Sequence, residues 1–248
     1  MRVLKIFIPF YIILIAAHFN AIQAQMSAHD SLVYKNAVKN VIEVYHQNIT
    51  DQSGLLNGSL YKGHKFFRYN EGHPFFTKNT YAKGAIVYDQ VAYNNIDMLY
   101  DQVDDVVIVQ DSPRQIQLVS ERINEFSLYG SRFVRIENDN PQSLLIGTGF
   151  YKALYVGHSS LYKKEIKIAR EKIYNSSELF ITYELNSYYY IKKENTYYEI
   201  KKVNDLLRLF KNKRKELEQY IDEAKLNFKK DKDNMLTKVV DYYEQITK

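Results

Sequence analysis

Hydrophobic and polar residues alternate through the middle of the chain, as they do in half-buried β-strands. In "KGAIVYDQVAYNNIDMLYDQVDDVVIVQDSPRQIQLV", which begins at Lys83, the apolar residues Ile96, Met98 and Tyr100 occupy every second position. Asp89-Gln90 separates two such runs and predicts a short hairpin turn, although Gln is a poorer turn residue than Gly. Short strands at spacings of about ten residues predict an antiparallel β-meander, folded as a sandwich or an open barrel.

The same alternation predicts further strands along the chain. Turn-forming residues at Asp111-Ser112-Pro113, at 138–141 and at Gly157-His158 separate these strands. The last hairpin is expected to turn over Glu194-Asn195. The predicted strands are residues 106–109, 126–128, 132–136, 148–155, 161–168, 188–192 and 197–200.

Apolar residues take a helical spacing near both ends. Residues 27–46 predict an N-terminal helix. Beyond residue 203 three short amphipathic helices are expected, the first capped by Asn204 and the third beginning at Asp231. Short isolated helices are marginal, so these should pack on the sheet or on one another. The expected fold is α+β, mainly β, with an N-terminal helix and a C-terminal cluster of three short helices.

The first residues have the composition of a secretory signal peptide. Arg2 and Lys5 precede an apolar run that ends at Ala17, and mostly small or polar residues follow up to Ala24. The run is shorter than the ~20 residues of a membrane-spanning helix, so cleavage after Ala24 and export are expected. The expected divisions are a signal peptide (1–24), an N-terminal helix and linker (25–60), an antiparallel β domain (61–202) and a C-terminal helical appendage (203–248).

Composition narrows the classes of function. The chain has no cysteine, which excludes disulfides, thiol catalysis and thiolate metal sites. The net charge of +5 falls to +3 when Arg2 and Lys5 leave with the signal peptide, which is too mild to indicate a nucleic-acid partner. The 23 tyrosines suit half-buried strands, and the lack of Trp makes a carbohydrate-binding surface less favoured.

A histidine doublet is the first candidate for chemistry. "GHKFF", which starts at residue 63, returns nine residues later as "GHPFF". A turn predicted at residues 70–72 would place His64 and His73 across a hairpin. A zinc site would need further ligands, and Glu71 is the only near one. We favour an architectural interpretation, with histidines at turns and Phe pairs alternating between core and surface. No cofactor or metal is expected, and His64 and His73 are weak candidates for metal ligands.

An acidic segment is the second candidate. Asp97, Asp101, Asp104 and Asp105 lack the glycine and the spacing of a calcium loop. Strand alternation directs Asp97 and Asp101 outward, so a solvated turn is expected. The chain also has no Gly-x-Ser-x-Gly and no phosphate-cradling Gly-x-Gly-x-x-Gly, so serine hydrolases and phosphate-binding proteins are not favoured.

Basic residues gather in the C-terminal helices. Glu216, Glu218 and Glu223 lie among them, which favours a solvated helix face. The functional alternative is an electrostatic patch for anionic lipid headgroups or an acidic partner. The candidate binding residues are Lys211, Lys213, Arg214, Lys215, Lys229 and Lys230.

Six segments follow one another in a recognisable order. They are "LNGSLY", "GHPFF", "KGAIVYDQVAYNNIDMLYDQVDDVVIV", "QLVSERINEFSL", "GFYKALYVG" and "LLRLFKNKRKELEQYIDEAKLNFKKDKDNMLTKVVDYYE". On these segments nearly the whole mature chain resembles a family of exported proteins common in Bacteroidota-type bacteria. The resemblance implies a location in the periplasm or at the outer-membrane periphery, and it supplies no activity and no catalytic residues. Family members tend to have Asp-Gly at the first hairpin, where this chain has Asp89-Gln90.

The sequence therefore favours a non-enzymatic cell-envelope module. The β-meander would bind a protein partner or an envelope component, with the helical tail as a docking arm. Peripheral membrane contact is an additional expectation, and no nucleic acid is expected. The alternative is a hydrolase of unrecognised type that uses His64, His73 and nearby carboxylates. Ligand carriage inside a closed sheet is a third interpretation, and it predicts a sizeable internal cavity.

Overall fold

The computed structural model describes residues 52–64, 69–138, 146–175 and 178–247. The chain divides into two units, Met1–Gln52 and Ser53–Lys248, and all the described residues beyond Gln52 belong to the second. The predicted signal peptide and the helix expected at 27–46 lie outside the described residues. Both stay predictions.

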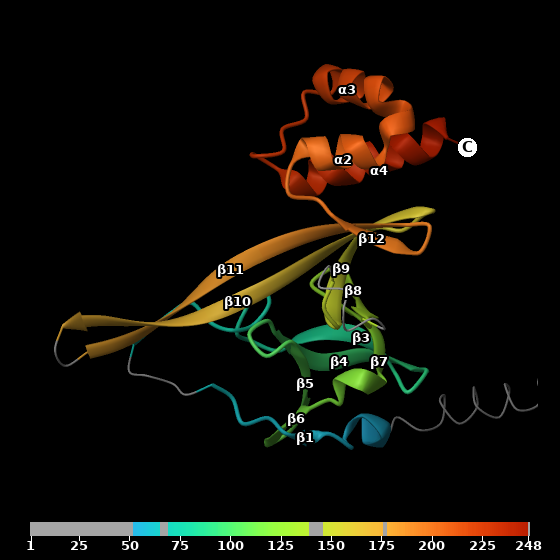
Figure 1. The fold of residues 1–248 in the computed structure, drawn as a ribbon. Helices are drawn as coiled ribbons and strands as arrows, with labels where there is room; N and C mark the ends of the chain where they lie inside the picture. The colour runs from blue at the N-terminus through green and yellow to red at the C-terminus, as the bar shows by residue number, and fades with distance from the viewer. Residues whose placement is uncertain (1–51, 65–68, 139–145, 176–177, 248) are drawn as a thin grey trace, which may run out of the picture. The chain divides into compact units, whose positions relative to one another are not determined.

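One twelve-stranded sheet forms most of the second unit (Figure 1). Neighbouring strands are antiparallel in the order β1-β6-β5-β4-β3-β7-β8-β9-β10-β11-β12, and β2 pairs in parallel with β11. The strands are β1 (Ser59–Leu60), β2 (Tyr69–Glu71), β3 (Ala82–Tyr88), β4 (Val91–Asp101), β5 (Val106–Asp111), β6 (Arg114–Gln117), β7 (Ile123–Leu128), β8 (Ser131–Ile136), β9 (Gly149–Tyr155), β10 (Ser159–Asn175), β11 (Glu178–Lys193) and β12 (Thr196–Glu199). Since the antiparallel path ends at β1 and β12, the described strands make a single open sheet. The antiparallel, mainly β prediction is confirmed at that level.

Two tight hairpins form where they were predicted. Asp89 and Gln90 join β3 to β4 with φ of 50° and 67°, and Glu194 and Asn195 join β11 to β12 with φ of 48° and 61°. Two successive residues with positive φ give a turn whose twist matches the flanking strands. The turn at Asp89-Gln90 therefore forms without the glycine that usually favours it.

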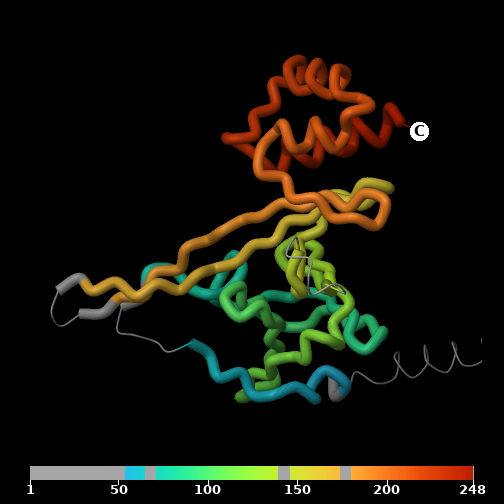
Figure 2. Tube along the Cα trace, viewed as in Figure 1, coloured from blue at the N-terminus to red at the C-terminus, as the bar shows by residue number. Residues whose placement is uncertain are grey.

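Strands β10 and β11 are longer than predicted. They contain 17 and 16 residues and pair along almost their whole length, so they form a two-stranded ribbon (Figure 2). Only Leu161–Lys163 of β10 pair with β9, and beyond Lys163 the paired strand of β10 among the described residues is β11 (Figure 1). On the other side of the ribbon, β11 pairs with β12 at Tyr190–Lys193 and with β2 at Phe180–Thr182. The prediction for β10 stopped at residue 168 because the charged run 170–172 interrupts the apolar pattern.

The main core lies on one face of the sheet, between β3 and β9. Its centre is a group of rings from four strands: Tyr100, Phe126, Phe133 and Phe150. The Phe126 and Phe133 rings stack with centroids 4.8 Å apart, and Tyr100 meets Phe126 edge-on at 5.2 Å. Ring pairs of this kind contribute about 0.5–1.5 kcal/mol beyond the burial of their area. The predicted alternation of Ile96, Met98 and Tyr100 is confirmed, since all three are buried.

Three helices follow the sheet, as predicted: α2 (Val203–Leu209), α3 (Arg214–Glu223) and α4 (Lys232–Ile246). Asp231 caps α4 by accepting a hydrogen bond from Asn234 N at 3.1 Å. The cap of α2 is Lys202 rather than the predicted Asn204. Short 3-10 turns occur at Gln52–Leu55, Ser120–Arg122 and Lys211–Lys213. None of the described helices is long and apolar enough to cross a membrane.

The helical cluster is packed on the sheet. Apolar side chains of all three helices share a core with Leu161, Tyr189, Ile191 and Ile200. The predicted packing of the helices is therefore confirmed. Their removal would uncover this core.

Two carboxylates of α4 fasten it to the strands. Glu244 accepts hydrogen bonds from Ser159 N at 2.7 Å and His158 N at 3.2 Å. Asp233 accepts one from the Tyr189 hydroxyl at 2.6 Å. Eleven residues make about three helical turns, so the two carboxylates lie on the same side of α4.

Candidate functional site

The described residues between β1 and β3, which are 61–64 and 69–81, include side chains that cover the face of the sheet opposite the main core. We call these residues the covering segment. Tyr61, Phe75 and Tyr81 pack there against a small cluster made by Leu99, Val106 and Ile108. Phe75 and Phe76 point to opposite sides, because Phe76 packs instead against Tyr100 and Phe133 of the main core. The predicted alternation holds for this Phe pair, and the earlier pair at 66–67 lies outside the described residues.

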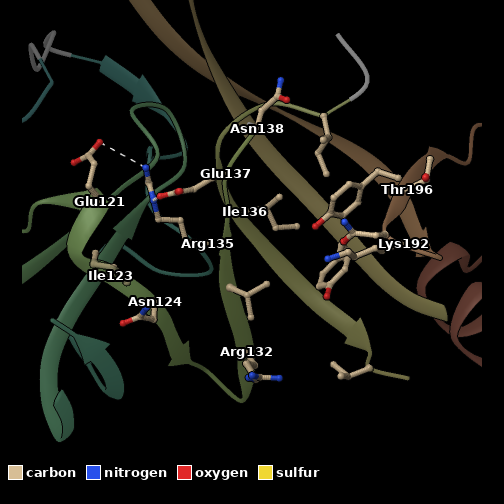
Figure 3. A pocket seen from close by; sticks show the side chains of 16 residues that line it. Glu121, Ile123, Asn124, Arg132, Arg135, Ile136, Glu137, Asn138, Lys192 and Thr196 are labelled. Atoms are coloured by element: carbon tan, nitrogen blue, oxygen red, sulfur yellow. Dashed lines mark hydrogen bonds and ion pairs between the residues drawn. The ribbon is translucent and has the colours of Figure 1, made fainter. Parts of the chain in front are cut away.

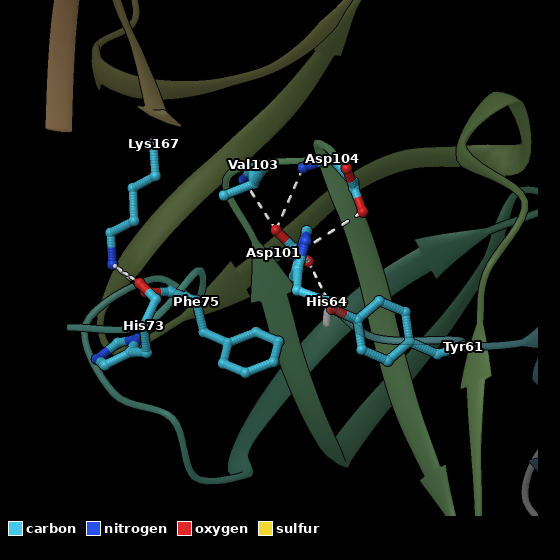
Figure 4. A network of polar contacts seen from close by, with 8 residues as sticks. All are labelled: Tyr61, His64, His73, Phe75, Asp101, Val103, Asp104 and Lys167. Atoms are coloured by element: carbon cyan, nitrogen blue, oxygen red, sulfur yellow. Dashed lines mark hydrogen bonds and ion pairs between the residues drawn. The ribbon is translucent and has the colours of Figure 1, made fainter. Parts of the chain in front are cut away.

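Asp101, at the end of β4, is completely buried. Its Oδ2 accepts hydrogen bonds from the Tyr61 hydroxyl and His64 Nε2, each at 2.6 Å. Its Oδ1 accepts from Val103 N at 2.8 Å and Asp104 N at 3.2 Å (Figure 4). The expectation that Asp101 points into solvent is wrong, because the segment that carries Tyr61 and His64 covers its face. All four acceptor directions of the carboxylate are occupied.

The aspartates of the acidic segment have different surroundings. Asp97 is exposed, as expected, and pairs with Lys83 at 2.7 Å. Asp104 is also exposed, but its Oδ2 lies 3.5 Å from His64 Nε2. One ligand-type atom from each of His64, Asp101 and Asp104 lies within 4.8 Å of the other two. We call these three residues the His64 cluster.

Tyr61 is held in its hydrogen-bonding state by the same arrangement. Burial, followed by the hydrogen bond to Asp101 and the charges of Asp101 and Asp104, raises the pKa of the Tyr61 hydroxyl. The hydroxyl therefore keeps its proton at physiological pH and donates it to the carboxylate.

His73 lies apart from this cluster. Its ring stacks on Phe75 with centroids 6.2 Å apart, and its Nδ1 is buried with no hydrogen-bond partner among the described residues. Burial, together with the charge of Lys167, lowers the pKa of His73 and favours the neutral ring. The Lys167 ammonium donates to the carbonyl oxygens of His73 and Phe75 at 2.9 and 2.5 Å (Figure 4).

The hairpin predicted around residues 70–72 is wrong. Glu71 belongs to β2, and the register pairs it with Thr182 of β11. A distant strand thus takes the place of the expected local partner. The two histidines are nevertheless brought to one pocket by the covering segment.

This pocket has a volume of about 520 Å³. The Tyr81 hydroxyl, like His73 Nδ1, is buried there without a partner in the described parts of the chain. The pocket lies on the face of the sheet that the covering segment covers. The ligand-carriage interpretation predicts a cavity inside a closed sheet instead. Six rings line it: Tyr61, His64, His73, Phe75, Tyr81 and Tyr183.

Asp105 makes a second polar network, which sequence reasoning missed. It accepts hydrogen bonds from the Tyr100 hydroxyl at 2.6 Å, Lys164 Nζ at 2.5 Å and Phe150 N at 3.2 Å. Burial lowers the pKa of Lys164, and Asp105 opposes that shift. A Cβ on Gly149 would lie 2.1 Å from Asp105 Oδ2, so only glycine fits. The network joins the β4–β5 turn to β9 and β10, which is a structural role.

A larger groove of about 870 Å³ lies beside β8 and the β11–β12 turn (Figure 3). Arg135 faces Glu121 at 3.6 Å and Glu137 at 3.3 Å, and Arg132 donates to Glu125. Both guanidinium groups are thus already paired with carboxylates, which makes the groove a weaker candidate for an anionic ligand.

The predicted basic residues lie on α3 and around it. Lys213 pairs with Glu216 at 3.1 Å and Arg214 with Glu218 at 2.9 Å. The other four are exposed and have no ion pair within the described part of the chain: Lys211, Lys215, Lys229 and Lys230. Their exposure suits a solvated face and an electrostatic patch equally.

Comparison with known proteins finds no matching family model, no similar curated protein and no matching solved structure. The resemblance to exported proteins of Bacteroidota-type bacteria therefore stays a prediction.

Proposed function

We propose that this protein is an exported, non-enzymatic binding module of the cell envelope that docks a protein partner through the β10–β11 ribbon. The observation that carries the proposal is the exposure of large apolar side chains on the ribbon. Ile173 is 78% exposed and Leu185 is 52% exposed. Apolar side chains so open to water are typical of surfaces that a partner covers.

The pairing register places these side chains on one face. Odd-numbered residues of β10 pair with odd-numbered residues of β11, and cross-strand partners share a face. Ile173 therefore lies on the same face as Ile181, Tyr183 and Leu185. Ile181 is 7% exposed and Tyr183 lines the pocket of the covered face, so Ile173 and Leu185 are the members of this row that an apolar segment of a partner can reach.

The outer edge of β10 supplies backbone hydrogen bonds for such a segment. Lys167 N donates to Gln102 O at 2.9 Å, and from Ile168 to Ile173 no strand among the described residues pairs with this edge. An edge with unpaired N–H and C=O groups accepts an added strand. The alternating charges of residues 170–172 limit indiscriminate pairing. The partner that fits is an extended protein segment with alternating apolar residues.

The experiment is photo-crosslinking in the native envelope with the full-length protein. A photoreactive residue replaces Ile173 or Leu185 in separate variants. The control is the same replacement at Leu60, which is similarly exposed at 61% but lies on β1. We expect one discrete adduct from positions 173 and 185 and none from position 60.

Two outcomes contradict the proposal. Equal labelling at all three positions would indicate non-specific contact. An adduct with the mass of two copies would indicate self-association in place of a partner protein.

Export is a separate part of the proposal. It rests on the signal-like composition of residues 1–24. Fractionation of the native cells should recover the protein from the periplasm or the outer-membrane periphery, with Gln25 as its first residue. Recovery from the cytosol with Met1 intact would contradict it.

Peripheral membrane contact is another part of the proposal that can be tested separately from partner binding. Four exposed cations without ion pairs in the described chain favour attraction to anionic lipid headgroups. Binding to vesicles of phosphatidylglycerol and phosphatidylcholine should weaken in K229E/K230E, while vesicles of phosphatidylcholine alone should not bind. The proposed lipid-binding patch consists of Lys211, Lys213, Arg214, Lys215, Lys229 and Lys230. Unchanged binding by the variant would contradict this part of the proposal.

A hydrolase remains the second candidate, because one observation favours it. His64 is held by the buried Asp101 carboxylate at the wall of a pocket, as an orienting carboxylate holds a catalytic imidazole. Hydrolysis of p-nitrophenyl acetate above the buffer rate, and lost in His64→Gln, would support it. Activity that survives in His64→Gln would exclude this residue.

A further inference from the structure

We infer that the His64 cluster binds one divalent transition-metal ion, with zinc as the ion that fits best. The cluster offers one imidazole nitrogen and two carboxylate oxygens, and these atoms lie within 4.8 Å of one another. This inference does not depend on the docking proposal, since the ribbon edge and the cluster are made by different residues.

The distances are close to those of a coordination shell. Zinc takes nitrogen and oxygen ligands at about 2.0–2.2 Å, so two ligands of a tetrahedral ion lie about 3.3 Å apart. His64 Nε2 and Asp104 Oδ2 are already 3.5 Å apart. The His64 Nε2 and Asp101 Oδ2 atoms are at hydrogen-bond distance, 2.6 Å, and must separate by less than about 1 Å when an ion replaces the shared proton.

Asp101 is fixed in place by hydrogen bonds from groups other than the proposed ligand atoms. Its Oδ1 accepts from the backbone N–H groups of Val103 and Asp104, and its Oδ2 accepts from the Tyr61 hydroxyl. Hydrogen bonds of this kind orient metal-binding carboxylates, and their loss typically lowers metal affinity by about 10- to 100-fold. Tyr61 is therefore a positioning residue.

The ligand types select the class of ion. Calcium prefers six to eight oxygen ligands and magnesium an octahedron of oxygens, whereas an imidazole with two carboxylates suits zinc. Three protein ligands leave a fourth position of the tetrahedron open. His64 also lines the pocket in which His73 Nδ1 and the Tyr81 hydroxyl have no partner among the described residues. The wall of this pocket therefore combines one ligand of the cluster with two polar atoms that a bound molecule would satisfy.

The test is calorimetric titration of the chelator-treated full-length protein with zinc chloride. We expect one equivalent to bind. His64→Ala and Asp104→Asn should each weaken binding at least 100-fold, and Tyr61→Phe should weaken it about 10- to 100-fold. His73→Ala is the matched control, because it changes the other histidine of the same pocket, and its affinity should match that of the unaltered protein.

Three results overturn the inference. They are no binding by the unaltered protein, equal binding by Asp104→Asn, or loss of binding in His73→Ala. Asp104 is exposed, so Asp104→Asn is expected to fold even if His64→Ala does not. With cobalt chloride, the unaltered protein should show the intense visible bands of a tetrahedral ion, and Asp104→Asn should not. Equal bands in both would place the ion elsewhere.

Discussion

Replacement of Asp101 by alanine tests whether this buried carboxylate holds the covering segment on the sheet. The change removes the acceptor for the Tyr61 hydroxyl and His64 Nε2. Hydrogen bonds to a charged group contribute about 1.5–3 kcal/mol each, so these two bonds account for about 3–6 kcal/mol. The amides of Val103 and Asp104 lie beside exposed positions and regain water, so they add little. We expect Asp101→Ala to lower the free energy of unfolding by about 3–6 kcal/mol.

The assay is urea unfolding followed by tyrosine fluorescence and circular dichroism, with a chelator present so that metal binding does not contribute. Asp97→Ala is the matched control, because Asp97 lies on the same strand but is 42% exposed and pairs with Lys83. An exposed pair of this kind contributes about 0–1 kcal/mol. If the two variants lose the same free energy, the Asp101 hydrogen bonds do not hold the segment and the reasoning is refuted.

Three further predictions concern other parts of the fold. Glu244→Ala should lower the unfolding free energy by about 3–6 kcal/mol, because the Ser159 and His158 amides each lose a charged acceptor. In urea unfolding, Glu218→Ala, which removes a surface ion pair, should lose less than about 1 kcal/mol. Gly149→Ala should cost about 3 kcal/mol or more in thermal and urea unfolding, because its φ is 148° and the new Cβ would overlap Asp105; a wild-type midpoint would contradict this. The folded protein lowers the pKa of His73, so below about pH 6.5 the unfolded chain takes up this proton first and stability should fall. Urea unfolding near neutral pH and at about pH 5 should show a smaller loss in His73→Gln, and an equal loss would exclude His73.

The sequence correctly predicts the turns, strand faces and helix starts that are determined by residues close to one another along the chain. The two hairpins are marked by polar pairs between β-rich runs, and each pair adopts positive φ at both residues. The alternation at Ile96, Met98 and Tyr100 correctly assigns the core face of β4. The start of α4 follows from Asp231, whose side chain is a strong cap. Each of these features depends on residues that are close along the chain.

The candidate site depends on contacts that are far apart along the chain. Strand alternation correctly assigns Asp101 to the face opposite Tyr100, but it does not reveal that Tyr61, Phe75 and Tyr81 cover that face. His64 was recognised as a candidate ligand, and its partners were not, because Asp101 and Asp104 lie almost forty residues further on. The ribbon was underestimated for a related reason. Each strand of β10–β11 is stabilised by the other along its length, so charged residues are tolerated there.

The parallel pairing of β2 with β11 has a consequence for the order of folding. Tyr69 is in register with Phe180, so β2, which belongs to the covering segment, cannot pair until β11 has been synthesised much later. The longest loop within the meander from β3 to β9 is closed by Ala85 and Ser127, 42 positions apart (127 − 85). Tyr69 and Phe180 are 111 positions apart (180 − 69), so their pairing loses more chain entropy. The covering segment should therefore dock last, onto a sheet that is already formed. Its backbone amides should exchange with deuterium sooner than those of β4, and the ability to hold an ion would arise only in the final step of folding.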